Sequence, residues 1–316
     1  MVRAEHLLIS ALTTALLSAA GFAQSAPRPS DEIVKQAVAA RGAYLDEFRN
    51  LVSNENRTVT VYAKDGDVKR RKSVSSKFVV YRSTKQADRI TEFRNVTAVN
   101  GEIVPGTEKR VEDFFVSVQK AESSAKELER IVTESQRYDD ELAINGFTLF
   151  QGVTLAENLR PYFEFNVVGT EIISGVDTLV IEYRQTRPSP FIRVNDPPPS
   201  DGSVGVFYDS GLEIKNGVNE RLSGRIWLDA GNYRIWKEQR TMTVQPEGFP
   251  KPVIVAQTDF EYGPSDFGIL TPRRIVHSQY QILKKERASR KDVSVTLEYD
   301  KFRRPDVEVK VTEDSP

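Results

Sequence analysis

The side chains with the greatest capacity for chemistry are few in this sequence, and none is arranged as a catalytic group. The chain has two histidines, His6 and His277, and no cysteine. A Ser-His-Asp triad would therefore depend on His277, and no Gly-x-Ser-x-Gly turn accompanies it. The lack of cysteine excludes disulfides, thiolate metal sites and a thiol nucleophile. The alternation along its strand predicts that His277 is an ordinary histidine on the solvent side.

Carboxylates gather in two clusters, Asp139-Asp140-Glu141 and Asp65-Gly66-Asp67. Neither has the alternating ligand spacing of a calcium loop, and both fall where acidic residues are common, after a helix and in a tight turn. Asp266-Phe267-Gly268 spells a kinase metal-binding tripeptide, but the other kinase motifs and the glycine-rich phosphate loops are missing. We therefore expect no enzymatic activity, no metal and no cofactor.

Basic side chains form two runs, Lys69-Arg70-Arg71-Lys72 and Lys284-Lys285 with Arg287, Arg290 and Lys291. Both runs lie at or beside predicted hairpin ends, where solvated turns are the ordinary interpretation. The functional alternative is contact with anionic lipid head groups. With 44 basic and 45 acidic side chains the net charge is -1, which gives no reason to expect nucleic acid as a partner.

The first 23 residues predict a secretory signal peptide rather than structure. Arg3 precedes an apolar run from Leu7 to Phe22, and Gly21 and Ala23 place small residues before the predicted cleavage site. The run is about 16 residues, shorter than the roughly 20 needed to span a bilayer. We expect export to the periplasm, no transmembrane span after removal of this segment, and a single mature domain over residues 24–316.

The mature chain should begin with a helix and continue as strands. An apolar stripe at helical spacing predicts an amphipathic helix over residues 31–52, with Ser30 as its cap. Alternating runs then predict an antiparallel meander, which includes a hairpin at Asn100-Gly101. A helical insert is expected over about 107–138, as two helices of which the second is capped by Ser124.

Strands dominate from about residue 160 onward, interrupted by a proline-rich surface loop at about 187–203. A turn at Asp229 to Asn232 predicts a hairpin in which Arg225 lies beside Trp236, and Trp227 beside Arg234. About ten antiparallel strands with one buried face must curl around a filling. We therefore predict a mainly β (α+β) fold: a large curved antiparallel sheet, or half-barrel, with the first helix and the insert against its concave face.

Several stretches resemble the outer-membrane lipoprotein carrier proteins and their periplasmic relatives. The resemblance rests on the order of elements, on residues 169–182 (GTEIISGVDTLVIE), on Gly224 to Asp229 followed by Tyr233 to Ile235, and on Leu297 to Arg304. It covers most of the mature chain, and its motifs are turns and strand edges. It implies a curved half-barrel and suggests a cavity for a hydrophobic ligand.

The resulting functional hypothesis is a non-enzymatic periplasmic protein that binds a hydrophobic or lipid-type ligand, or a lipidated protein, in the concavity. The insert would act as a gate that moves at the joint from Glu122 to Ser124. The alternative is a structural or protein-interaction domain of the cell envelope with a solidly packed interior. The candidate residues of the cavity or its gate are Phe114, Phe115, Val118, Leu128, Ile131, Ile226, Tyr233, Phe260 and Tyr280, and Val132 continues the helical stripe.

Overall fold

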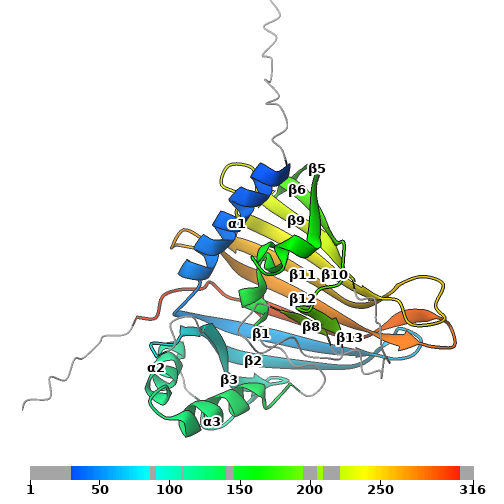
Figure 1. Cartoon of the computed structure of the whole chain (residues 1–316). Helices are drawn as coiled ribbons and strands as arrows, with labels where there is room; N and C mark the ends of the chain where they lie inside the picture. The colour runs from blue at the N-terminus through cyan, green and yellow to red at the C-terminus, as the bar shows by residue number, and fades with distance from the viewer. Residues whose placement is uncertain are drawn as a thin grey trace, which may run out of the picture.

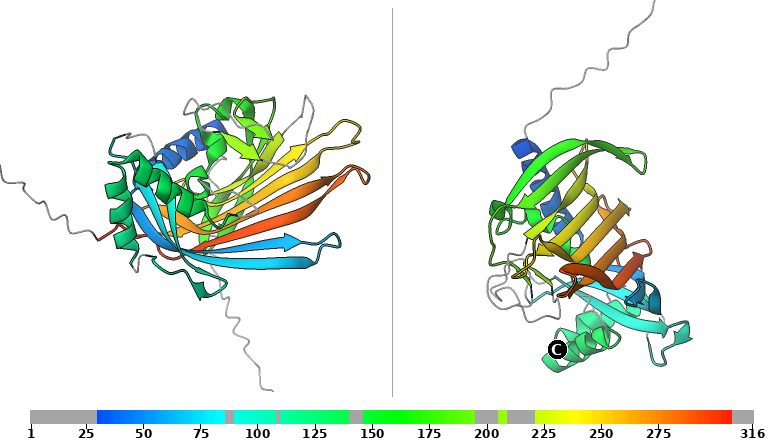
Figure 2. Two further views of the ribbon diagram at one scale, coloured as in Figure 1. Left: turned by 90° about the horizontal axis from the view of Figure 1, so that it is seen from below. Right: turned by 90° about the vertical axis from the view of Figure 1, so that its right-hand side faces the viewer.

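The computed structural model of the chain describes residues 30–85, 90–107, 110–139, 146–194, 205–208 and 221–306. Over these residues, eleven strands form one open antiparallel sheet in the order β4-β3-β2-β1-β13-β12-β11-β10-β9-β6-β5. The sheet is curved (Figures 1 and 2), which confirms the predicted half-barrel. Its strands are β1 (Leu51–Tyr62), β2 (Val68–Arg82), β3 (Ile90–Val99), β4 (Glu102–Ile103), β5 (Phe163–Ile173), β6 (Val176–Gln185), β9 (Arg221–Asp229), β10 (Ile235–Val244), β11 (Val253–Pro264), β12 (Leu270–Leu283) and β13 (Ala288–Tyr299).

Smaller elements cover the sheet. The α-helices are α1 (Ser30–Glu47), α2 (Val111–Ala121) and α3 (Ala125–Gln136), and the 3-10 turns are η1 (Phe147–Phe150), η2 (Val153–Leu155) and η3 (Arg160–Tyr162). Two short parallel strands, β7 (Ile192–Val194) and β8 (Val206–Tyr208), pair with each other. Within the described ranges, no helix is long and apolar enough to cross a membrane.

The strand β1 is the fourth strand of the sheet from the β4 edge, and it pairs on both sides. It forms a hairpin with β2, and it pairs with β13, the last strand of the sheet, with Val59 opposite Val295. The sheet therefore consists of two parts, the meander from β1 to β4 and the strands that end in β13. The pairing of β1 with β13 joins these two parts. The hairpin at Asn100-Gly101 is confirmed, since both residues have the positive φ of the predicted tight turn, 50° and 84°.

The first helix is shorter than predicted. It ends at Glu47, and β1 begins at Leu51, so Leu51 and Val52 belong to a strand. The cause is Asn50, which adopts a left-handed conformation (φ 51°) and accepts a hydrogen bond from the Arg82 backbone N–H at 3.0 Å. This turn reverses the chain so that the apolar stripe of α1 packs on the inner, concave face of the sheet (Figure 2).

The predicted cation and indole ladder between β9 and β10 is wrong. The register shifts between Ile235 and Lys237, so Lys237 lies opposite Trp227. The Lys237 ammonium lies 4.8 Å from the centre of the Trp227 ring, and the Trp227 indole donates to Glu171 at 2.8 Å. One inserted residue in a strand is enough to change every later pair on that strand.

The proline-rich stretch is only partly the surface loop that was expected. Residues 195–204 lie outside the described residues, but Ile192 and Val194 form β7 and are buried with the inner core. Val206 and Tyr208 on the paired strand are buried in the same core. We call the pair β7 and β8 the flap, because it lies on the inner side of the sheet rather than in solvent.

The helical insert has the two predicted helices, and Ser124 caps the second by accepting from the Glu127 N–H. The first helix, α2, begins after Arg110 rather than near residue 107, and no side chain caps it. The expected position on the concave face is wrong. The paired residues Val52 and Val79 pack with the insert, whereas their strand neighbours Leu51 and Val80 face the inner core.

The insert therefore covers the outer face of β1 to β3. Successive side chains of a strand point to opposite faces, and an apolar stripe on a helix does not specify which face it will bury. The joint between α2 and α3 is also fixed rather than free. The Glu122 carboxylate accepts hydrogen bonds from the Tyr81 hydroxyl and from the backbone of Thr84 and Lys85, at 2.9, 2.8 and 3.3 Å.

Candidate functional site

The inner face of the sheet carries buried charge. Three strands place a glutamate and an arginine two residues apart, so both side chains point to the same face. All six are almost completely inaccessible to solvent, and each therefore needs a charged or hydrogen-bonding partner. They are Glu55 and Arg57 on β1, Glu92 and Arg94 on β3, and Glu238 and Arg240 on β10.

Arg94 joins two of these carboxylates. Its guanidinium donates to both oxygens of Glu55, at 2.8 and 2.9 Å, and lies 3.3 Å from Glu92. Burial alone would lower the pKa of Arg94, but the two carboxylates outweigh burial and hold this pKa well above its ordinary value. The guanidinium also lies over the ring of Phe78, 4.8 Å from its centre. Arg57, two residues after Glu55 on β1, forms an ion pair with Asp139.

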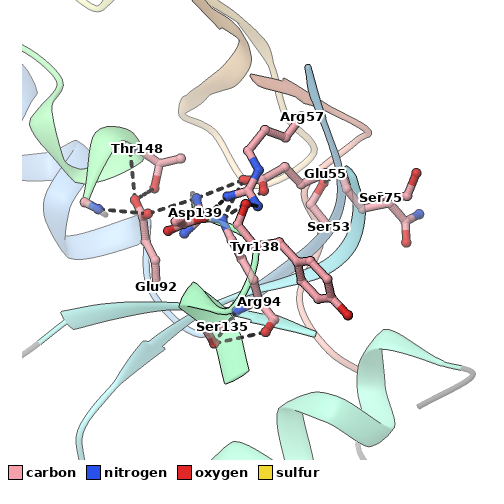
Figure 3. A network of polar contacts seen from close by, with 12 residues as sticks. Ser53, Glu55, Arg57, Ser75, Glu92, Arg94, Ser135, Tyr138, Asp139 and Thr148 are labelled. Atoms are coloured by element: carbon pink, nitrogen blue, oxygen red, sulfur yellow. Dashed lines mark hydrogen bonds and ion pairs between the residues drawn. The ribbon is translucent and has the colours of Figure 1, made fainter. Parts of the chain in front are cut away.

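Glu92 fastens a covering segment to this charged group. One of its oxygens accepts from the Thr148 N–H and hydroxyl at 2.9 and 2.6 Å, and the other accepts from the Gly146 N–H at 2.9 Å. Figure 3 shows the Glu92 carboxylate in contact with both Thr148 and Arg94. The Tyr44 hydroxyl donates to the Thr148 carbonyl at 2.7 Å, so α1 holds the same segment from its other side.

Glu238 and Arg240 hold the following residues of that segment. Glu238 accepts from the Gly152 N–H at 2.9 Å and from Arg240 at 2.7 Å, and Arg240 donates to the Phe150 carbonyl at 2.9 Å. The chain is packed closely here, because a Cβ at Gly152 would lie 2.7 Å from a methyl group of Ile235. We call residues 146–152 the latch, since buried charges on the inner face bind it at both ends.

His277 is buried beside this group, and its predicted place on the solvent side is wrong. It lies opposite Thr258, whose hydroxyl is 2.8 Å from Nδ1, and its ring stacks on Tyr208 of the flap. Burial, with the charge of Arg240, lowers the pKa of His277 to about 3. Ile275 and His277 of β12 both point to the inner face.

The next row of the inner face is apolar. Strand pairing places Met242, Ala256, Gln279, Val293 and Val61 side by side across five strands, and of these only Gln279 is polar. Met242 and Ala256 are fully buried. The flap lies close to this row, because Tyr208 stacks on His277 in the adjacent row. We call Met242, Ala256, Val293 and Val61 the apolar row.

The candidate residues chosen from the sequence lie in three different places. Ile226, Tyr233 and Phe260 are buried in the inner core as expected. Tyr280 lies on the outer face, where its hydroxyl donates to Gln257 at 3.0 Å, so its expected place in the concavity is wrong. The insert residues belong to a separate outer cluster, with Phe114, Phe115, Val118 and Ile131 buried and Leu128 and Val132 partly buried.

The charged group and the latch were not predicted from the sequence, although the charged group has a signal in it. The signal is the pattern Glu-x-Arg, which occurs in β1, β3 and β10. In each case the residue between the glutamate and the arginine faces the other side of the sheet. The same pattern at Glu182-Tyr183-Arg184 is exposed on the outer face, so the pattern alone does not indicate burial. Over the described ranges, no three metal-ligating side chains come together.

Two surface hollows lie by the insert and the neighbouring β3–β4 hairpin. One of about 250 Å³ lies between β3, α2 and α3 and is lined in part by Phe114, Ile131 and Arg130. A second, of about 480 Å³, is lined by residues around the β3–β4 hairpin, and Ile103 in this group is 82% exposed.

Together these features define an open, curved antiparallel half-barrel with a charged inner centre. Neither family models nor curated proteins match the chain. Among solved structures it is similar to a DUF1329 family protein from Desulfovibrio piger, with 12% identity over 88% of this chain and 93% of that chain, and a TM-score of 0.30. It is also similar to a putative outer membrane lipoprotein-sorting protein domain from Vibrio parahaemolyticus, with 10% identity over 89% and 96% and a TM-score of 0.32.

A third similar structure is a LolA superfamily protein from Nitrosomonas europaea, with 10% identity over 89% of this chain and 96% of that chain and a TM-score of 0.30. These are proteins of the group that the sequence resembles. With TM-scores of 0.30 to 0.32, these similarities carry no conclusion about this chain.

Proposed function

We propose that the protein is a non-enzymatic binding protein of the periplasm that takes a hydrophobic, acyl-type ligand beneath the flap. The observation that carries this proposal is the apolar row, which lies beside His277 and Tyr208 on the inner face. A straight hydrocarbon chain gains free energy from such a surface in proportion to the apolar area that it covers.

The latch and the flap differ in what their displacement would cost. Moving the latch would leave the buried carboxylates of Glu92 and Glu238 without the backbone N–H groups that they bind, at several kcal/mol. The flap places Ile192, Val194 and Val206 in the inner core. An acyl chain can replace those apolar contacts, so the flap is the element that we expect to move.

Two neighbouring residues on β10 allow a matched test. Met242→Gln places an amide of similar size in the apolar row, whereas Thr241→Gln makes the same side chain on the outer face of the same strand. We expect the first variant to bind a fluorescent fatty acid at least about fivefold more weakly, and the second to bind like the unaltered protein. Thermal unfolding of both variants checks that the fold is retained.

The competing function is an envelope interaction domain with a closed interior. The latch favours this alternative, because the latch is bound firmly to the inner face by buried charges. Lipid extraction and mass spectrometry of the protein from its native host separate the two functions. A co-purified acyl lipid supports the ligand site. Absence of lipid, together with no binding of the fluorescent fatty acid, would refute it and favour the interaction domain.

A further inference from the structure

Two hairpin turns from distant parts of the sequence lie side by side at one end of the sheet. Because β1 pairs with β13 in antiparallel register, the turn after β1 (63–67) and the turn before β13 (284–287) meet. Arg290 donates to the Lys64 carbonyl at 2.9 Å and joins the two hairpins directly. Figure 1 shows both tips at the same end of the strands.

These hairpins concentrate positive charge. Residues 63–72 and 284–292, which we call the basic tip, contain ten basic and four acidic side chains, a surplus of six positive charges. The whole chain has a net charge of -1. The molecule is therefore strongly polarised, and an anionic surface would attract this end and repel the rest.

The basic side chains of the tip are largely available to a partner. Over the described residues, those that are exposed and form no salt bridge are Lys64, Lys69, Arg71, Lys284, Lys285 and Arg287. By contrast, Arg184 and Arg225 on the outer face pair with Glu164 and Glu182 at 2.7 and 2.5 Å. Val68, between the cations of the first hairpin, is 51% exposed.

We propose that the basic tip docks the protein onto the surface of an anionic lipid bilayer. Adjacent exposed cations at one end of an elongated sheet can approach a plane of head groups together, and the exposed Val68 can enter the boundary of the acyl region. This surface lies on the hairpins and not on the inner face, so the proposal does not depend on a ligand beneath the flap.

Co-sedimentation with vesicles tests the proposal on the full chain without its predicted signal segment. Phosphatidylcholine vesicles are compared with vesicles that also contain phosphatidylglycerol, at low and at physiological salt. The test variant combines Lys69→Glu, Arg71→Glu and Lys285→Glu. The control variant combines Lys35→Glu, Lys120→Glu and Lys126→Glu, three exposed lysines on helices, and makes the same change in net charge.

We expect binding to the anionic vesicles only, weakened by salt and reduced about a hundredfold in the test variant. Each basic side chain near such a surface raises the binding affinity roughly fivefold, so the loss of three lowers the affinity about a hundredfold. The control variant should keep most of the binding. Equal loss in both variants, or no preference for anionic vesicles, would overturn the proposal. Binding of a polyglutamate peptide without vesicle binding would also overturn it, in favour of an acidic protein partner.

Discussion

Buried charges are the residue-scale feature on which the inner face depends. Glu92 and Glu238 each accept hydrogen bonds from the latch and from an arginine two residues along the same strand. Such burial is not predictable from residue type, because glutamate and arginine are ordinarily exposed unless they are paired. The partners come from residues 146–152, which are distant in sequence and carry no motif. Only the folded arrangement reveals that they meet.

His277 should make stability depend on pH. Its pKa is about 3 in the folded protein and ordinarily about 6.5, so the unfolded chain binds more protons between these values. Stability should therefore fall as the pH drops below about 6.5, by roughly 2 to 3 kcal/mol at pH 4.5 from this residue. Urea unfolding of the wild type and of His277→Gln at both ends of this range measures it. An equal pH dependence in the variant would contradict this assignment.

Gly224 should tolerate no side chain. A Cβ there would lie 1.9 Å from the Gln239 carbonyl oxygen and 2.6 Å from the Tyr183 hydroxyl. We expect Gly224→Ala to destabilise the protein by about 3 kcal/mol or more, because backbone must move to admit the methyl group. Gly42→Ala is the control. Its Cβ would meet nothing within 4 Å, and within α1 it should stabilise by about 0.5 to 1 kcal/mol. Thermal unfolding of both variants checks the contrast.

At the scale of elements, local sequence patterns were sufficient to predict strands and turns. They were not sufficient to predict the face of the sheet on which the helices pack. The hairpin at Asn100-Gly101 and the Ser124 cap depend on neighbouring residues and were predictable. The end of α1 depends on one left-handed asparagine, Asn50. The face that the insert covers depends on the course of the chain after β4, which the periodicity of α2 and α3 does not encode.

The position of the insert leads to a clear expectation for Phe114→Asp. Phe114 is 4% exposed in the outer cluster, so we expect a loss of about 3 to 5 kcal/mol in stability. If enough folded protein remains, binding of a fluorescent fatty acid should be unchanged, because the apolar row lies on the other face. Weaker probe binding with unchanged stability would instead support the gating role first expected for this insert.

At the scale of the whole molecule, the targeting signal gives a prediction that is independent of the fold. Residues 1–23 lie outside the described residues, and we expect export to remove them and leave Gln24 at or near the amino terminus. Intact mass spectrometry of the protein from the periplasm measures this directly. A protein that retains Leu7 to Phe22 would contradict it.

The half-barrel as a whole was predictable because its alternating strands and turns follow one another along the chain. The register of single pairs was not, since one shifted residue near Trp236 changes its neighbours. The latch, the flap and the meeting of the two basic hairpins depend on contacts between distant residues, and local sequence does not specify such contacts.

The pairing of β1 with β13 has a consequence for the order of folding. Loop closure between the two strands spans nearly the whole domain, and such long-range contacts form slowly. Neither meander can pair its joining edge until β13 has been synthesised. We therefore expect the nascent chain to stay incompletely folded until its last strand is made, a state compatible with the export that residues 1–23 predict.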